Sequence, residues 1–438
     1  MVRTLFALKN VVTCNNSFEI FRNGVIVVED GNIIYVGKRE DLPYNKNYFD
    51  FIIEEEYGIA MPGLINCHTH AAMSLFKGVA DDLPLNRWLN EVIWPLESKV
   101  DSESLLYGNY IAIMEMLSSG TTTFADFYFF KELIESVRTI PIRSVATVAL
   151  MDMVADGESY WKRLKNIGYF IEVVNSVDGG RVTLALGPHA IYTCTEPLLR
   201  EVVKVSIANS LPIQIHLSET VDEQNYSRLN FGMSPVEYLD RINILSNRVF
   251  AAHCIYLNDK DIRILSDRHV NCVHDPSSNL KLASGIMPMY SLVKQGINVC
   301  LGTDGCASAN SLNMLGEMRL ALILQRGLRL DPTFPTAKDV LLMATLRGAK
   351  ALGLDKKIGS IEEGKRADFV IFNGRSPRLL PEHDVVSNIV YSSNPLDITY
   401  TVVDGKVLYE HGRFSNLDIE KIFDVFGTKA LALLKDAK

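Results

Sequence analysis

The chain has 438 residues, of which 47% are hydrophobic and 22% are charged, so it can bury a sizeable core. Its formal net charge of -8 argues against broad binding to nucleic acid or to an anionic membrane, because such binding needs a basic surface. We therefore expect a small-molecule partner, and the length predicts one large domain plus a smaller one.

The compartment is predicted from what the sequence lacks. No apolar run approaches the ~18 residues of a membrane span, and the apolar segment at the N-terminus is too short for a signal peptide. The seven cysteines are an odd number without a C-x-x-C pair, which favours reduced, buried thiols over disulfides or a thiolate zinc site. We expect a cytoplasmic protein.

Both ends of the chain carry β-type patterns. In residues 1–58 the candidate strands are Thr4–Thr13, Gly24–Glu29 and Asn32–Gly37, with Asp30-Gly31 as a hairpin turn. The same pattern returns at Gly359–Phe372 and Tyr400–Tyr409. We therefore predict one small β-sandwich domain built from residues 1–58 and 356–414, followed by a C-terminal helix over 415–438.

Residues 59–355 have a different rhythm, in which short apolar runs alternate with segments of helical periodicity. Eight runs are candidate strands: Leu64–Cys67, Thr121–Ala125, Arg143–Ala149, Val182–Leu186, Pro212–Ile215, Val249–Ala252, Asn271–Val273 and Asn298–Leu301. Eight β/α units of this length predict an α/β fold with a (β/α)8 TIM-like barrel, whose reactive groups sit at the C-terminal ends of its strands.

Most histidines fall at that predicted end of the barrel. In M-P-G-L-I-N-C-H-T-H, two of them are spaced by one residue, and residues so spaced on a strand share one face. Six of the nine histidines lie at or just beyond a predicted strand end: His68, His70, His189, His216, His253 and His274. A single histidine there is more often a core residue, but six at one rim favour a shared site.

Imidazole and carboxylate donors suit a borderline divalent ion such as Zn²⁺, and Fe²⁺ accepts the same set. We predict that His68, His70, His216 and Asp304 hold it. Asp304, in T-D-G after the eighth run, could also be a turn residue or a base. The fourth run contains no lysine that could bridge two ions, so we expect one metal ion.

Two further residues are candidates for proton transfer. Glu219 follows His216 by three residues, where a carboxylate could take a proton from an attacking water and deliver it to a substrate nitrogen. The alternative is a helix N-terminal glutamate in a T-x-D-E turn. His253 could assist the attacking water or polarise the intermediate, or it could orient Asp304.

Several stretches together carry a resemblance to a known family. They are M-P-G-L-I-N-C-H-T-H-A-A-M-S-L-F-K-G from Met61, W-P-L-E from Trp94, G-P-H-A-I-Y-T from Gly187, I-H-L-S-E-T from Ile215, S-N-L-K-L-A-S-G-I from Ser278, L-G-T-D-G from Leu301 and G-K-R-A-D-F-V from Gly364. They resemble the amidohydrolase superfamily, and within it the deaminases of S-adenosylhomocysteine and 5'-methylthioadenosine, which are related to the triazine chlorohydrolases.

The resemblance implies the same metal ligands, Glu219 as the proton shuttle and His253 as an aid to the activated water. It also implies that Glu97 binds the ribose hydroxyls and that Trp88 and His189 contact the nucleoside. From sequence alone Glu97 could be an exposed helix residue, Trp88 a core anchor and His189 a capping residue. Asn279 could order the loop after the seventh strand.

The chain also departs from the family pattern. Relatives active on S-adenosylhomocysteine can hold its amino-acid carboxylate with two arginines, and here Arg163 could be one, whereas the third strand has no arginine around Val148. Arg163 could equally be a solvated helix charge. We therefore keep 5'-methylthioadenosine, adenosine and 5'-deoxyadenosine as candidates beside S-adenosylhomocysteine. Asp275 stands where relatives often have asparagine, and the sequence assigns it no consequence.

The predicted activity is hydrolytic deamination of a 6-aminopurine nucleoside, in which water attacks C6, Glu219 and Asp304 relay its proton, and ammonia leaves. One alternative is a guanine, pyrimidine or triazine aminohydrolase or chlorohydrolase on the same site. Another is a non-catalytic relative that has become a binding protein. The sequence leaves open whether the chain forms a homo-oligomer.

Overall fold

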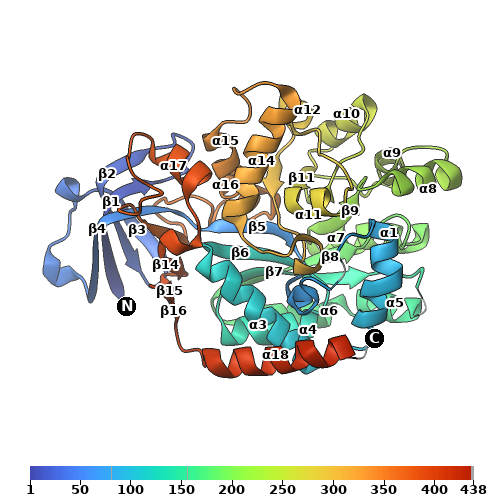
Figure 1. Cartoon of the computed structure of the whole chain (residues 1–438), viewed down its shortest axis with the longest axis horizontal. Coiled ribbons are helices and arrows are strands. Elements are labelled where there is room, and N and C mark those ends of the chain that lie inside the picture. The colour runs from blue at the N-terminus through green and yellow to red at the C-terminus, as the bar shows by residue number, and fades with distance from the viewer. Residues whose placement is uncertain (80, 155, 436–438) are drawn as a thin grey trace.

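The computed structural model describes residues 1–79, 81–154 and 156–435. Its strands form two sheets (Figure 1). One sheet is formed by both ends of the chain, and its strand order is β16-β15-β14-β13-β4-β1-β2-β3. The other is formed by the middle of the chain in the sequential order β5 to β12.

The second sheet is the barrel. Its strands are β5 (Leu64–Thr69), β6 (Thr121–Phe127), β7 (Arg143–Leu150), β8 (Val182–Pro188), β9 (Ile213–Leu217), β10 (Val249–His253), β11 (Asn271–His274) and β12 (Val299–Leu301). Neighbouring strands pair in parallel, and Thr303, just beyond β12, donates its backbone N–H to the carbonyl of His68 on β5 at 3.2 Å. These strands confirm the predicted (β/α)8 barrel, and seven of the eight end one or two residues later than expected.

Helices connect and cover these strands. The 3₁₀ helices are η1 (Arg39–Asp41), η2 (Lys46–Tyr48), η3 (Ala71–Phe76), η5 (Asp178–Gly180) and η6 (Pro395–Asp397), and η4 (Trp88–Ile93) is a π-helix. The α-helices are α1 (Leu85–Arg87), α2 (Trp94–Glu97), α3 (Ser102–Ser118), α4 (Phe130–Thr139), α5 (Gly157–Lys165), α6 (Ile167–Asn175), α7 (Glu196–Asn209), α8 (Val221–Phe231), α9 (Pro235–Arg241), α10 (Asp259–Asp267), α11 (Pro276–Lys281), α12 (Met289–Lys294), α13 (Cys306–Ala309), α14 (Met314–Arg329), α15 (Ala337–Met343), α16 (Leu346–Ala351), α17 (Val385–Ser392) and α18 (Ile419–Lys435).

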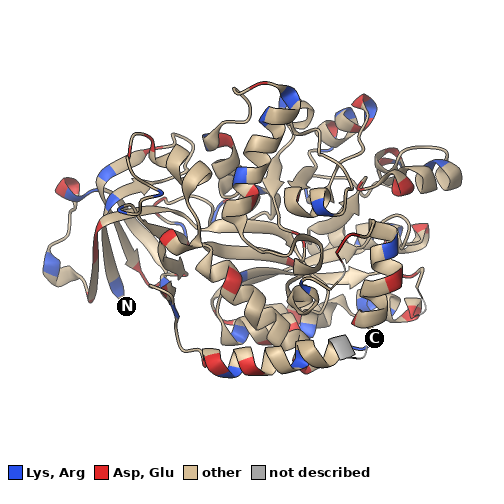
Figure 2. Ribbon diagram, in the orientation of Figure 1, with Lys and Arg blue, Asp and Glu red and all other residues tan. Residues whose placement is uncertain are grey.

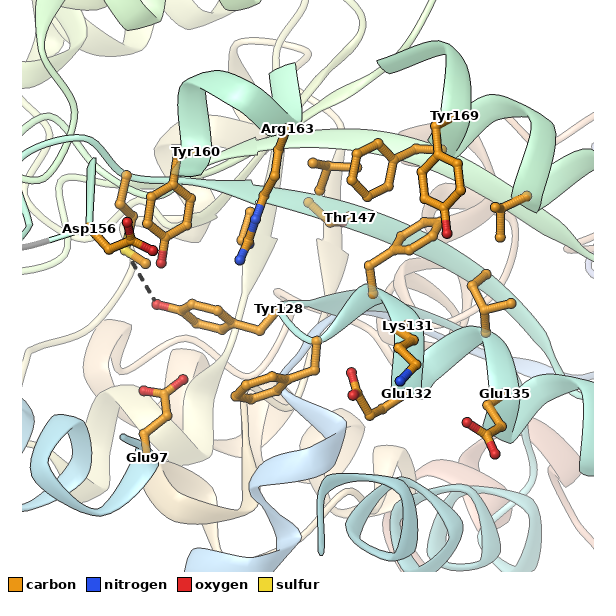
Figure 3. Close-up of a pocket in the computed structure, with 18 of the residues that line it drawn as sticks. Glu97, Tyr128, Lys131, Glu132, Glu135, Thr147, Asp156, Tyr160, Arg163 and Tyr169 are labelled. Atoms are coloured by element: carbon orange, nitrogen blue, oxygen red, sulfur yellow. Dashed lines mark hydrogen bonds between the residues drawn. The ribbon is translucent and has the colours of Figure 1, made fainter. Parts of the chain in front are cut away.

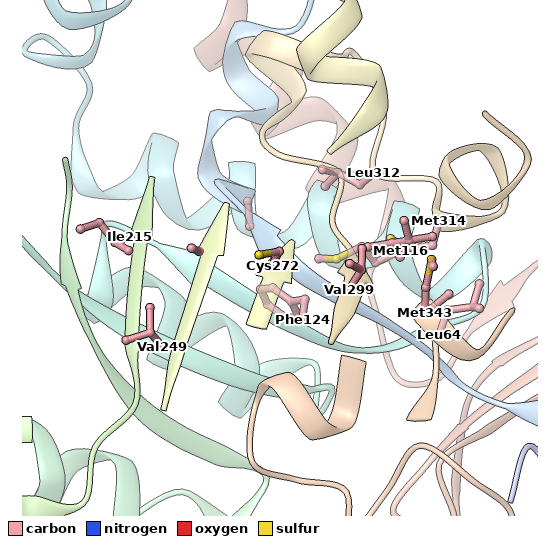
Figure 4. Packing of buried hydrophobic residues seen from close by; sticks show 14 of the residues in the cluster. Leu64, Met116, Phe124, Ile215, Val249, Cys272, Val299, Leu312, Met314 and Met343 are labelled. Atoms are coloured by element: carbon pink, nitrogen blue, oxygen red, sulfur yellow. The ribbon is translucent and has the colours of Figure 1, made fainter. Parts of the chain in front are cut away.

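Strand alternation separates the core from the site. On β9, Ile213 and Ile215 belong to the hydrophobic cluster between sheet and helices, part of which is drawn in Figure 4, and Gln214 and His216 therefore face the barrel interior. A second cluster fills that interior, with Phe250, Val273 and Cys300 among its members. All seven cysteines are buried and unpaired, as predicted.

The sheet built from both chain ends contains β1 (Arg3–Val12), β2 (Ile20–Glu29), β3 (Asn32–Lys38), β4 (Phe51–Pro62), β13 (Phe369–Asn373), β14 (Ile398–Val403), β15 (Lys406–Glu410) and β16 (Arg413–Phe414). The two halves join where β13 pairs antiparallel with β4, with Ile371 opposite Ala60. Asp30 and Gly31 have φ of 48° and 81°, the left-handed geometry of the predicted hairpin turn.

A buried ion-pair network ties this sheet to the barrel. Arg143, the first residue of β7, donates from Nε to Asp368 at 2.6 Å and from a terminal nitrogen to Asp404 at 2.5 Å. Its side chain is 3% exposed, and Asp404 also accepts from Arg366 at 2.6 Å.

Helix α18 runs beside α3 along the outside of the barrel (Figure 1). Its Lys429 pairs with Asp101 at 2.8 Å and with Glu103 at 2.7 Å. Phe426 and Leu433 pack into the same hydrophobic cluster as Trp88. Residues 436–438 of the predicted C-terminal helix lie outside the described residues.

Charges of both signs are mixed along the outer helices (Figure 2). Among the described residues, no helix combines the length and apolar character that crossing a bilayer requires.

Candidate active site

Three histidines converge at the carboxyl end of the barrel. His68 is the last residue but one of β5, His70 directly follows that strand, and His216 lies on β9. The ring of His68 is 5.0 Å from that of His70 and 4.9 Å from that of His216, centroid to centroid. All three side chains are buried, His70 being the most exposed at 9%.

Asp304 joins this group from the loop after β12. Its Oδ1 lies 3.2 Å from Nε2 of His70 and 3.6 Å from Nε2 of His68. Burial raises the pKa of Asp304, but the two imidazoles beside its Oδ1 outweigh this and hold the pKa well below the usual value. The four residues predicted as metal ligands are therefore brought together, with Asp304 as a carboxylate.

The outer contacts of these side chains fix the orientation of the rings and of the carboxylate. His216 donates from Nδ1 to the carbonyl of His189 at 2.9 Å, which leaves its Nε2 lone pair available. The amide of Gln214 lies 2.7 Å from Nδ1 of His68. Asp304 accepts hydroxyl protons from Ser278 at 2.6 Å and Ser308 at 2.7 Å.

This donor set fits a divalent ion. Among the described residues, His68 Nε2 is buried without a hydrogen-bond partner, as an unsatisfied ligand atom would be. Burial lowers the pKa of His68 to about 4 and that of His216 well below its usual value, so both are neutral donors. Two triads have donor atoms within 4.8 Å of one another: His68, His70 and Asp304, and His68, His216 and His253.

Glu219 and His253 face each other beside these ligands. Glu219 Oε2 lies 3.8 Å from His253 Nε2, and Glu219 Oε1 accepts the hydroxyl of Ser284 at 3.3 Å. Glu219 is only 6% exposed, and burial raises its pKa, which suits a group that takes and returns a proton. Thr220 caps α8, so Glu219 precedes the helix and is not its first-turn glutamate.

His253 is held by the residues after β11. Its Nδ1 lies 2.8 Å from Asn279 Oδ1, and Asp275 accepts its backbone N–H at 3.3 Å. Burial lowers the pKa of His253, but the carboxylates of Glu219, Asp275 and Asp304 outweigh this and raise it to about 9. Asn279, predicted to order this loop, therefore also orients the ring of His253.

Two cavities lie beside each other near the cluster, and the inner one opens onto it. The inner one has a volume of about 50 Å³ and is lined by residues that include Trp88 and His189. The outer one, about 1100 Å³, is lined by residues that include Glu97 and Arg163. Trp94 and Tyr128 line both, so the four predicted substrate contacts are divided between two adjoining spaces.

Figure 3 shows Glu97 and Arg163 extending toward Tyr128 from opposite sides of the outer cavity. Burial raises the pKa of Glu97 to about 7, and the charge of His70 partly offsets this rise. Arg163 is exposed on α5, and its guanidinium carbon lies 4.6 Å from the centre of the Tyr160 ring. Val148 lines the same cavity from β7.

Sequence reasoning missed several residues of the site. Gln214 had a readable signal, because it lies two residues before His216 on a strand and so shares its face. Tyr128 has φ of 95°, which is strained for a non-glycine residue, and donates to the sulfur of Met151 at 3.6 Å. Ser278 and Ser308 had no signal, because only folding brings them to Asp304.

A barrel whose carboxyl end gathers imidazoles, an aspartate and a buried glutamate has the architecture of a metal-dependent hydrolase. The amidohydrolase family model matches residues 59–408. The chain belongs to this family, whose members are metal-dependent enzymes.

Named relatives cover nearly the whole chain. A 5'-deoxyadenosine deaminase of Methanopyrus kandleri is 43% identical over 92% of this chain and 93% of its own. A 5-methylthioadenosine/S-adenosylhomocysteine deaminase of Thermodesulfovibrio yellowstonii is 42% identical over 94% and 95%. The crystal structure of an adenosine deaminase from Xanthomonas campestris with bound zinc superimposes with a TM-score of 0.93 at 31% identity, covering 99% of each chain.

Proposed function

We propose that the protein is a cytoplasmic zinc-dependent deaminase that hydrolyses the 6-amino group of an adenine nucleoside, such as 5'-deoxyadenosine, 5'-methylthioadenosine or S-adenosylhomocysteine. The observation that carries this proposal is a small cavity lined by His70, His216 and Asp304 that shares Trp94 and Tyr128 with a roomy cavity, which has Glu97 in its wall. Ligand pockets usually measure roughly 300 to 1,000 Å³, so the inner cavity of about 50 Å³ needs the outer one to hold a nucleoside.

Each residue of the cluster has a proposed role in the reaction. His68, His70, His216 and Asp304 would hold the ion, which supplies the Lewis acidity that makes water nucleophilic at neutral pH. Glu219 takes one proton of the attacking water and delivers it to the purine ring nitrogen. It then moves the second proton, from the hydroxyl on the tetrahedral carbon, to the departing amine, which leaves as ammonia. His253, opposite Glu219, donates to the oxygen that develops negative charge.

The substrate is oriented by the two cavities. The 6-amino edge of the purine faces the inner cavity, with Trp88 and His189 in its wall, and the sugar occupies the outer one. Glu97 accepts hydrogen bonds from the ribose hydroxyls, and the 5' substituent points toward Arg163 and Val148. Relatives active on S-adenosylhomocysteine can hold its carboxylate with two arginines, and this chain has a candidate for only one of them, Arg163. We therefore expect neutral 5' groups to be used at least as well as an amino-acid tail.

The test is ammonia release from adenosine and its three 5'-modified derivatives, with metal content measured on the same sample. Glu97→Ala should cripple turnover of the nucleosides and spare any turnover of free adenine. Glu135→Ala, at another part of the same cavity wall, is the matched control and should leave nucleoside turnover unchanged. The proposal fails if zinc-replete protein releases no ammonia from any adenine nucleoside.

A further inference from the structure

The start of α8 carries an altered helix cap beside the site. Thr220-x-x-Glu223 is the pattern of a capping box, in which the glutamate binds the N–H of the capping residue. Thr220 does accept the N–H of Glu223 at 3.2 Å. The carboxylate of Glu223, however, accepts the N–H of Ser218 at 3.0 Å and that of Glu219 at 2.8 Å.

The next helix provides the ordinary form of the same motif. At α9, Glu237 binds the N–H of its capping residue Ser234 at 2.9 Å, is partly exposed and pairs with Lys260. Glu223 is 3% exposed and has no ion-pair partner among the described residues. Burial of its carboxylate raises its pKa to about 7. A glutamate that only capped a helix would stay near water, so burial of Glu223 indicates another role.

The two N–H groups that Glu223 binds belong to a strained turn. Ser218 has φ of 52°, a left-handed conformation that is unfavourable for a non-glycine residue. Other bonds secure the same residue: its carbonyl accepts the N–H groups of Ile255 at 3.0 Å and Tyr256 at 2.8 Å, and Gln224 donates to its hydroxyl at 3.2 Å. Such strain persists only where the surroundings over-determine it.

This turn sets the direction of Glu219. The chain leaves β9 at Leu217 and bends at Ser218, and the Glu219 carboxylate then lies 3.8 Å from His253. Besides this contact, the Glu219 carboxylate accepts the hydroxyl of Ser284 at 3.3 Å. Within the part of the chain that the structure describes, the backbone N–H of Glu219 is bound by Glu223 alone.

We propose that Glu223 is a positioning residue for the reaction: it binds the two successive N–H groups of Ser218 and Glu219 and so holds the Glu219 carboxylate over the substrate cavity. This role rests on the proposed function, in which Glu219 moves the proton. The altered cap thus fixes the position of Glu219 relative to α8.

Glu223→Gln is the first test, because a glutamine can accept only one of the two N–H groups with its single oxygen. We expect kcat to fall about 10- to 100-fold, the scale of a displaced catalytic group, with KM and metal content unchanged. Glu237→Gln removes the matched cap of α9 and should leave kcat unchanged. Should Glu223→Gln fail to fold, Glu223→Asp keeps the charge, shortens the reach and should lower kcat in the same way.

Two readouts separate positioning from plain stability. In a Glu219→Gln background, Glu223→Gln should cause little further loss of kcat, because it acts through Glu219. Amide exchange at Ser218 and Glu219 should be faster in Glu223→Gln, whatever the substrate proves to be. The proposal is overturned by an undiminished loss in the Glu219→Gln background or by unchanged protection of both amides. An inactive wild type would refute only the proposed function, because amide exchange still decides the role of Glu223.

Discussion

Gly302, directly after β12, has no room for a side chain. A Cβ added there would lie 2.3 Å from Asp275 Oδ1 and 2.9 Å from the backbone nitrogen of His68, whereas ordinary contact begins at 3.4 Å. Gly302 is not among the residues with positive φ, so Gly302→Ala tests space alone. The neighbours must yield by about 1 Å, and a displacement of that size at a catalytic group costs about 100-fold in rate.

We therefore expect Gly302→Ala to lower kcat/KM about 100-fold and the free energy of unfolding by about 1–3 kcal/mol, the usual cost of overpacking. The assay is ammonia release from the best nucleoside, with metal content and a urea melt on the same sample. Gly327→Ala on α14 is the control, since a Cβ there meets nothing within 4 Å, and it should preserve activity. A wild-type kcat/KM in Gly302→Ala would contradict the prediction that a small displacement of His68 slows the reaction.

Other predictions concern stability and metal. Arg143→Met should cost about 3–5 kcal/mol in urea denaturation, because it leaves Asp368 and Asp404 buried without their shared cation, and a loss below about 1 kcal/mol would contradict this. Burial raises the pKa of Glu317 from 4.5 to about 7, so the folded state binds more protons between these values and stability falls as pH rises through them. Glu317→Gln should therefore raise the free energy of unfolding by about 3 kcal/mol at pH 8 and by almost nothing at pH 4. An equal increase at both pH values would refute this prediction. Chelation should abolish ammonia release while circular dichroism stays folded, with zinc restoring turnover; full activity in stripped protein would exclude a metal role.

The barrel was predictable because its strands are buried on both faces and stand out as short, mostly apolar runs between helical segments. Their ends were also informative, since histidines follow so many of them. Strand β4 was missed because Glu54, Glu55 and Glu56 interrupt any alternation at its exposed half. There the strand is specified by pairing with β1 and not by its own pattern.

The site was predictable only for residue types whose side chains are themselves typical metal ligands. His68, His70, His216 and Asp304 were named from strand position, and the structure brings them together as a cluster. The partners that orient them could not be named, because Ser278 and a backbone carbonyl act through geometry created by folding. The size of the outer cavity is likewise a property of packing between elements far apart in sequence.

The pairing of β4 with β13 has a consequence for synthesis on the ribosome. Ile371 must be translated before it can bond to the strand that contains Ala60, so β4 keeps an unsatisfied edge while roughly three hundred residues emerge. Nascent chains that stall within the barrel would expose that edge to one another. Truncated products ending before β13 should therefore aggregate or recruit chaperones, even where the barrel itself has already formed.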